Sequence, residues 1–124
     1  MEGITYSFEK LTVWQEAKCL VVEVYHLLDK FPQFEKFALC DQIRRAIVSV
    51  PSNIAEGSGR KSLKEQKHFL EIAYGSLMEA FSQLQIAQDM GYITEEEVDA
   101  IRPSFISVAK MLSGLKGYFV KGDR

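Results

Sequence analysis

Hydrophobic residues recur every three or four positions along most of the chain, which is the period of an amphipathic α-helix. The spacing runs over residues 12–30, from a start between residues 34 and 41 to residue 57, over residues 62–90, and from residue 94 onward. No segment shows the strict alternation that is typical of a half-buried strand. The pattern therefore predicts four helices joined by short loops.

The same spacing predicts which residues each helix buries. The first helix places one stripe on Trp14, Ala17, Val21, Val24, Leu28 and Phe31. The second places its stripe on Leu39, Ile43, Ala46, Ile47, Val50 and Ile54. The fourth places its stripe on Val98, Ile101, Phe105, Val108, Leu112, Leu115 and Phe119. Each helix is thus expected to turn one apolar face toward a shared core.

Sequence signals mark where these helices begin and end. Capping boxes, in which Ser or Thr is followed three residues later by Glu or Gln, satisfy backbone N–H groups at a helix start. Three such boxes open at Thr12, Ser62 and Thr94. The expected stops are a Phe-Pro step and two glycine-containing turns, at residues 31–32, 57–59 and Gly91.

The predicted fold is all-α, an antiparallel up-down four-helix bundle, because short loops favour antiparallel neighbours. Proline lacks an N–H and crowds the carbonyl four residues before it. We therefore expect a kink near Pro51 and a bend or short break near Pro103. A chain of 124 residues suits one domain, so residues 1–124 are assigned to a single bundle.

The third helix carries more apolar residues than one buried stripe requires. Its predicted core stripe is Leu70, Ala73, Leu77, Ala80, Leu84 and Ala87. Five further apolar residues lie outside it, namely Ile72, Tyr74, Met78, Phe81 and Ile86. A helix that is apolar most of the way round is usually buried most of the way round, so we expect self-association, with Gly75 and Ser76 permitting close approach of a neighbouring backbone. The alternative is that these are ordinary exposed apolar residues of a monomer.

Composition narrows the class of protein without naming a function. The 15 basic and 17 acidic side chains nearly cancel, which argues against a surface built entirely to bind a polyanion. No apolar run approaches the roughly 18 residues of a membrane span, and residues 1–5 lack the pattern of a secretion signal, so we expect a cytoplasmic protein with no membrane partner. Cys19 and Cys40 form no C-x-x-C pair and are expected to act as small hydrophobes.

The sequence offers little enzyme chemistry. Two Glu-x-x-His pairs, at residues 23–26 and 65–68, are the pattern that di-iron bundles use. Here their helical phase places His26 and His68 on outward faces, where they cannot share a metal. The serines have no histidine in a recognised arrangement, and no glycine loop has the full phosphate-binding fingerprint. We predict no catalytic residue, metal, cofactor or small-molecule substrate.

Local charge is more informative than the total. Residues 36–67 hold 7 basic and 3 acidic side chains, whereas residues 68–100 hold 0 and 7. The candidate site for nucleic acid or a partner consists of Arg44, Arg45, Arg60, Lys61, Lys64 and Lys67. These side chains are suited to phosphates, to the acidic block of a neighbouring subunit, or simply to water.

A polar stripe on the second helix is a candidate oligomer interface. It consists of Gln42, Arg45, Ser49, Ser52, Asn53 and Glu56. An Arg and a Glu on such a stripe can close a hydrogen-bonded network across an interface, although an ordinary wet helix face has the same composition. Two functional hypotheses remain open at this stage: a non-enzymatic oligomeric scaffold, and an RNA-binding accessory protein that uses the six basic residues.

The sequence of the second helix also resembles that of a known protein family. Residues 42–57 read QIRRAIVSVPSNIAEG. Further matching positions are Phe8-Glu9-Lys10-Leu11, Trp14-Gln15, Phe31-Pro32, Arg60-Lys61-Ser62, Glu65, Phe69-Leu70, Ile72-Ala73, Gly75-Ser76 and Glu79. Together they make the chain similar to the 23S rRNA intervening-sequence protein family of bacterial four-helix bundle proteins over nearly its whole length.

The resemblance implies a bundle that assembles into a homopentamer and whose molecular role is not established. It supplies no catalytic residues. A structural relative of that family, the accessory variability determinant of diversity-generating retroelements, is a pentameric bundle that binds reverse transcriptase and nucleic acid through a strongly basic surface. The present chain departs from that relative in being slightly acidic, with a net charge of -2.

Overall fold

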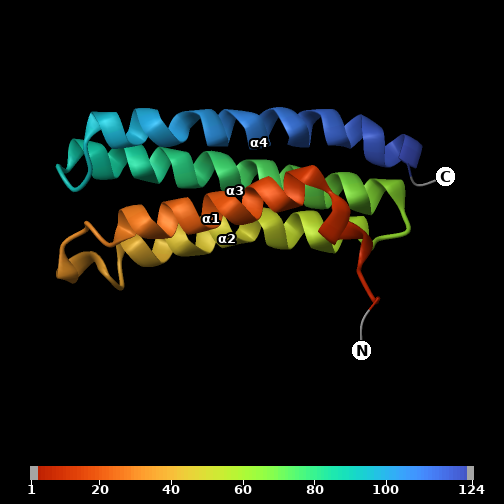
Figure 1. Ribbon diagram of the computed structural model, residues 1–124, viewed down its shortest axis with the longest axis horizontal. Helices are drawn as coiled ribbons and strands as arrows, with labels where there is room; N and C mark the ends of the chain where they lie inside the picture. Colours follow the sequence, from red (N-terminus) through yellow and green to blue (C-terminus); the bar gives the residue numbers. More distant parts are fainter. Residues whose placement is uncertain (1–2, 123–124) are drawn as a thin grey trace.

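The computed structural model describes residues 3–122, with side chains described for residues 3–114, and consists of four helices lying side by side (Figure 1). The helices are α1 (Thr12–Leu28), α2 (Leu39–Ser58), α3 (Leu63–Asp89) and α4 (Glu95–Gly122). Two short 3-10 turns that were not predicted, η1 (Ser7–Lys10) and η2 (Gln33–Glu35), precede α1 and α2. Residues 3–122 contain no strand.

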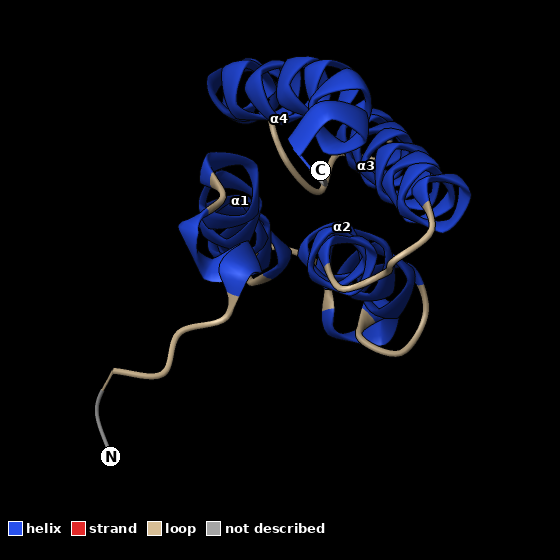
Figure 2. Cartoon of the chain, turned by 90° about the vertical axis from the view of Figure 1, so that its right-hand side faces the viewer, coloured by secondary structure: helices blue, strands red, loops and turns tan. Residues whose placement is uncertain are grey.

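Each helix packs against the next one in the chain, and α1 also packs against α4, which closes the bundle (Figure 2). The most extensive contact joins α2 to α3, and the least extensive joins α1 to α4. The two bundle ends are therefore distinct: the α2–α3 turn lies at one end, and the α1–α2 and α3–α4 connections lie at the other (Figure 1). The predicted antiparallel four-helix bundle is confirmed.

The core confirms most of the predicted apolar stripes. All six predicted positions on α3 are buried, as are those on α2 except the partly buried Leu39. On α1 the predicted stripe was displaced by one residue at two points: Val13 and Leu20 are buried, whereas Trp14 and Val21 are only partly buried. Trp14 instead packs edge-on against Phe8 of η1, with ring centroids 4.9 Å apart. On α4 the buried stripe runs from residue 98 to residue 112, and the predicted positions 115 and 119 lie outside the described side chains.

Of the three predicted capping boxes, the one at Thr94 forms completely and only half of the one at Ser62 forms. At Thr94 both halves form, because Glu97 N donates to Thr94 Oγ1 at 3.1 Å and Thr94 N donates to Glu97 Oε1 at 2.9 Å. At Ser62 the hydroxyl oxygen accepts from Glu65 N at 3.1 Å. Gly91 has a φ of 84°, the left-handed conformation expected of a helix stop.

The box predicted at Thr12 is wrong. The residue that precedes α1 is Leu11, with no side-chain cap, and Thr12 is already inside the helix. Gln15 Nε2 donates to the carbonyl oxygen of Glu9 at 2.7 Å, because η1 brings that carbonyl beside the first turn of α1. The reciprocal pattern occurs upstream, where Tyr6 N donates to Glu9 Oε2 at 2.9 Å.

Neither proline interrupts its helix, so the short break considered at Pro103 is absent, whereas the kink near Pro51 and a bend near Pro103 stay predictions. Both α2 and α4 continue without a break through Pro51 and Pro103. Core residues on either side of each proline, such as Ile47 and Ile54 on α2, are fully buried and hold the two halves of the helix against the bundle. Tertiary packing thus outweighs the local helix-breaking tendency of proline.

Candidate functional site

The six candidate basic residues do not form one cluster. Four lie at the α2–α3 turn and on the first turns of α3: Arg60, Lys61, Lys64 and Lys67. Arg44 and Arg45 lie near the start of α2, 16 and 15 residues before Arg60. At a rise of about 1.5 Å per residue they are roughly 20 Å away along the helix axis. The structure therefore brings four of the six together, and we call these four the basic turn.

Within the basic turn, Arg60 is already engaged. Its Nη2 donates to Glu56 Oε2 at 2.6 Å, its guanidinium lies 4.9 Å from the centre of the Phe69 ring, and its carbonyl oxygen accepts from Gln66 Nε2 at 2.7 Å. The three lysines are exposed and form no ion pair with any described residue. The positive charge available to a partner is thus carried by the lysines, while Arg60 holds the turn.

The polar stripe of α2 divides into an inner and an outer part. The inner part faces α3: Ser49 Oγ lies 2.8 Å from Ser76 Oγ, and Asn53 Nδ2 donates to both the carbonyl oxygen and Oγ of Ser49 at 2.8 Å each. Ser76 is thus engaged inside the protomer. The proposed close approach of a neighbouring backbone therefore depends on Gly75, which is exposed and has no atom within 4 Å of where a Cβ would lie.

The outer part of the stripe faces solvent. Arg45, with its side chain 80% exposed, pairs with Asp41 at 3.2 Å, and Glu56 pairs with Arg60. Ser52 and Gln42 are also exposed, and Gln42 Oε1 accepts from Gln83 Nε2 at 3.4 Å. No contact joins Arg45 to Glu56 among the described residues, because Arg45 pairs with Asp41 and Glu56 pairs with Arg60. Their predicted role across an interface stays a prediction.

Two buried glutamines on α3 were missed in the sequence. Gln66 is 3% exposed and holds the basic turn through its bond to Arg60, and Gln83 is 8% exposed and donates to Gln42 and to Glu79. The Oε1 atoms of both lack a hydrogen-bond partner within the described part of the chain. Gln66 lies four residues before Leu70, so extending the core stripe by one turn would have located it.

Most of the surplus apolar residues of α3 are exposed in the single chain. Tyr74 and Met78 are each 40% exposed, and Ile72 and Ile86 are exposed on the opposite flank. Phe81 is the exception, because it packs against Phe105 of α4 with ring centroids 4.9 Å apart.

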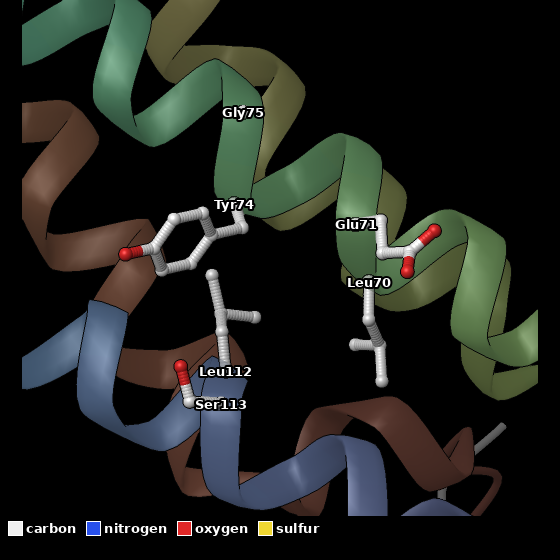
Figure 3. Close-up of a pocket in the computed structure, with 6 residues that line it drawn as sticks. All are labelled: Leu70, Glu71, Tyr74, Gly75, Leu112 and Ser113. Atoms are coloured by element: carbon white, nitrogen blue, oxygen red, sulfur yellow. The ribbon is translucent and has the colours of Figure 1, made fainter.

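Exposed residues also lie on the side of α4 that meets α3. Arg102 of α4 lies over the Phe81 ring, and Ile106, one helical turn further, is 46% exposed. A hollow of about 240 Å³ follows, with Leu70 and Leu112 at its base; Figure 3 shows Tyr74 extending over it toward α4 and Glu71 pointing away. The hollow also reaches Gly75 and Ser113. We call Tyr74, Met78, Phe81, Ile106 and this hollow the α3/α4 apolar surface.

Other predicted features are placed as follows. Glu23, His26, Glu65 and His68 are all exposed, and among residues 3–122 no three potential metal-ligating side chains are grouped. Cys40 is buried, as expected of a small hydrophobe, but Cys19 is exposed, because its helical position is on the side of α1 away from the buried stripe. None of the described helices has a stretch apolar and long enough to span a bilayer.

Comparison with known proteins connects this bundle to a family. The profile described as 23S rRNA-intervening sequence protein matches residues 9–114. The chain belongs to the 23S rRNA-intervening sequence protein family. The resemblance read from residues 42–57 is thereby confirmed, and the relation to the accessory variability determinant stays a prediction.

A solved structure gives the same fold. It is described as a protein with unknown function from the S23 ribosomal protein family of Bacteroides thetaiotaomicron. It matches with a TM-score of 0.74 at 23% sequence identity, covering 85% of this chain and 98% of that one. A search of curated proteins found no match. For this member of the 23S rRNA-intervening sequence protein family, the likeness therefore establishes the fold and leaves the role to be argued from the surfaces.

Proposed function

We propose that the protein is a non-enzymatic homo-oligomeric scaffold whose copies associate through the α3/α4 apolar surface. The observation that carries this proposal is that Tyr74 and Met78 of α3 and Ile106 of α4 are exposed, and that Tyr74 lines an apolar hollow between the two helices. Each of these side chains is still 40–46% exposed, so burying the remainder contributes roughly 1 kcal/mol apiece, and several of them together favour association. Exposed apolar patches of this kind mark interaction sites more often than scattered single residues do.

The charge distribution favours a second copy of the chain as the occupant. Residues 68–100 carry 7 acidic and 0 basic side chains, and residues 36–67 carry 7 basic and 3 acidic ones. If one surface of a copy contacts a different surface of the next, the acidic segment of one copy can face the basic segment of its neighbour. When such a head-to-tail contact repeats with a rotation that closes, the copies form a ring. We take the ring to be a pentamer, in line with the resemblance to the family.

Light scattering of the full chain after size-exclusion chromatography tests this proposal. The expected mass is about five times 14.1 kDa. The double variant Met78→Ser/Ile106→Ser is expected to dissociate while keeping its helical circular dichroism. The matched control is Val22→Ser/Val48→Ser, which removes exposed apolar residues from α1 and α2 and leaves the mass unchanged. A 14.1 kDa wild-type species, or dissociation by the control alone, contradicts the proposal.

The second candidate function is RNA binding by the basic turn. It is favoured by the three exposed, unpaired lysines at residues 61, 64 and 67. Contacts with phosphates weaken steeply with salt, because each neutralised phosphate releases counterions. Affinity for a structured RNA is therefore measured across salt concentrations for wild type, for Lys61→Gln/Lys64→Gln/Lys67→Gln, and for the control Lys10→Gln. The absence of binding even at about 50 mM salt rules out this function and leaves the scaffold proposal standing.

A further inference from the structure

A pocket of about 240 Å³ lies where α1 passes into α2, at the end of the bundle opposite the basic turn. Its base is apolar, and is formed by Leu28, Phe31 and Cys40, which are 8%, 8% and 4% exposed. Its walls carry polar groups from three successive segments of the chain. Concave sites with an apolar base and a few converging polar groups are the usual form of small-molecule sites.

Arg44 is the fixed polar group of this pocket. Its Nη2 donates to the carbonyl oxygen of Lys36 at 2.8 Å, which ties the α1–α2 connection to α2. Asp41 lies 3.7 Å from the same nitrogen, beyond good hydrogen-bond distance, and makes its shorter contact of 3.2 Å with Arg45. A guanidinium has five N–H groups, so most of those on Arg44 have no acceptor among the described residues. The side chain is 28% exposed, and is therefore held in place yet accessible.

Tyr25, Gln33 and Lys36 also line the pocket, and their side chains form no hydrogen bond within the described structure. The Lys36 ammonium lies 5.5 Å from the centre of the exposed Phe37 ring. The pocket lining includes one acidic residue, Asp29, and two basic residues, Lys36 and Arg44. Glu35, which is nearby in sequence, is engaged elsewhere, because its carboxylate accepts from Tyr92 Oη at 2.7 Å and from Leu39 N at 3.2 Å. The free groups are thus mainly donors above an apolar base.

We propose that this pocket binds a small organic carboxylate, with Arg44 and Lys36 holding the carboxylate group and Leu28 and Phe31 contacting the hydrocarbon body. The planar guanidinium matches a carboxylate with two parallel N–H donors. The volume equals that of about eight water molecules, which suits a compact anion and is too small for a nucleotide. The site is separate from both surfaces used in the proposed functions, and it does not depend on self-association.

Ligand-observed fluorine NMR with 4-fluorobenzoate and the full-length chain tests this inference, since the signal of the small molecule can be read at any oligomer size. We expect saturable binding in the millimolar range, displaced by benzoate and absent for the neutral 4-fluorobenzamide. Arg44→Gln is expected to weaken binding about tenfold, because it removes the charged hydrogen bonds. Lys64→Gln, which changes an exposed lysine of the basic turn at the opposite end of the bundle, serves as the control and is expected to leave binding unchanged.

Several results would overturn the assignment: no binding of 4-fluorobenzoate, equal binding of the amide, equal weakening by Lys64→Gln, or displacement by inorganic phosphate as effective as that by benzoate. If Arg44→Gln fails to fold, Lys36→Gln replaces it, because the bond to Arg44 uses the Lys36 carbonyl and survives the change. Lys36→Gln is expected to weaken binding several-fold, and wild-type affinity in that variant also contradicts the proposal.

Discussion

Gly57 and Phe69 lie at a close approach of α2 and α3, where a Cβ atom on Gly57 would lie 2.9 Å from the Cβ of Phe69. The Phe69 Cβ is fixed to the backbone of α3, so the two helices would have to move apart. Gly57→Ala is therefore expected to lower the free energy of unfolding by about 1–3 kcal/mol, although alanine has the better helix propensity. Chemical denaturation at one fixed protein concentration measures the change.

Gly114→Ala, on α4 and outside the α3/α4 apolar surface, is the matched control for this prediction. It also lies within a helix, but a Cβ there would have no atom within 4 Å. Relief of the glycine's conformational entropy is expected to raise stability by roughly 0.5–1 kcal/mol. Equal effects of the two substitutions on unfolding would show that the approach of Gly57 to Phe69 is not restrictive.

The helix caps give a second prediction. Thr94→Ala removes a hydroxyl that accepts from Glu97 N at 3.1 Å and is expected to lower the free energy of unfolding by about 1 kcal/mol. Thr12→Ala is expected to have almost no effect, because Thr12 lies inside α1 and caps nothing. Thermal or chemical unfolding of the two variants distinguishes these positions, and a Thr12→Ala loss as large as that of Thr94→Ala would contradict the assigned start of α1.

These contrasts show which features a single sequence reveals. The Thr94 box and the α3 core stripe depend on residues within one or two helical turns, so local spacing was sufficient to predict them. The Thr12 box had the same local pattern, yet η1 supplied a competing acceptor at the Glu9 carbonyl. Trp14 was similarly displaced from the core because η1 gave its ring an alternative partner in Phe8. The errors thus arise where a preceding segment folds back onto a helix.

The candidate sites were less predictable for a related reason. Arg45 and Arg60 are both in the basic block of the sequence, but α2 places them at opposite ends of the bundle. The pocket beside Arg44 is assembled from α1, the connection with η2, and α2. The shape of the pocket depends on how that connection turns back toward α2. The hydrogen bond from Arg44 to the Lys36 carbonyl holds this turn, and no periodic pattern in the sequence indicates it.

Glu97 gives a prediction for acid stability. The pKa of its carboxyl is lowered from about 4.5, first by its contact with Lys30 and then by the backbone N–H of Thr94. A carboxyl whose pKa is lower in the folded state contributes stability above its unfolded pKa and loses it as the pH falls through the folded value. Glu97→Gln is therefore expected to flatten the loss of melting temperature below about pH 4.5. The control is Glu96→Gln, because Glu96 makes no hydrogen bond or ion pair within the described chain. This variant should lose melting temperature below about pH 4.5 as the wild type does.

The two cysteines should differ sharply in thiol chemistry. Cys19 is exposed, whereas Cys40 is 4% exposed and burial raises the pKa of its thiol, with Arg44 opposing and Glu35 adding to that effect. Because the thiolate is the reactive form, a disulfide reagent at mildly alkaline pH should modify Cys19 quickly and Cys40 slowly. Cys19→Ser should abolish the fast phase and Cys40→Ser should preserve it, while denaturant should make both thiols react at similar rates. A fast phase that survives Cys19→Ser would mean that the chain around Cys40 opens readily, which is incompatible with a connection pinned to α2 by Arg44.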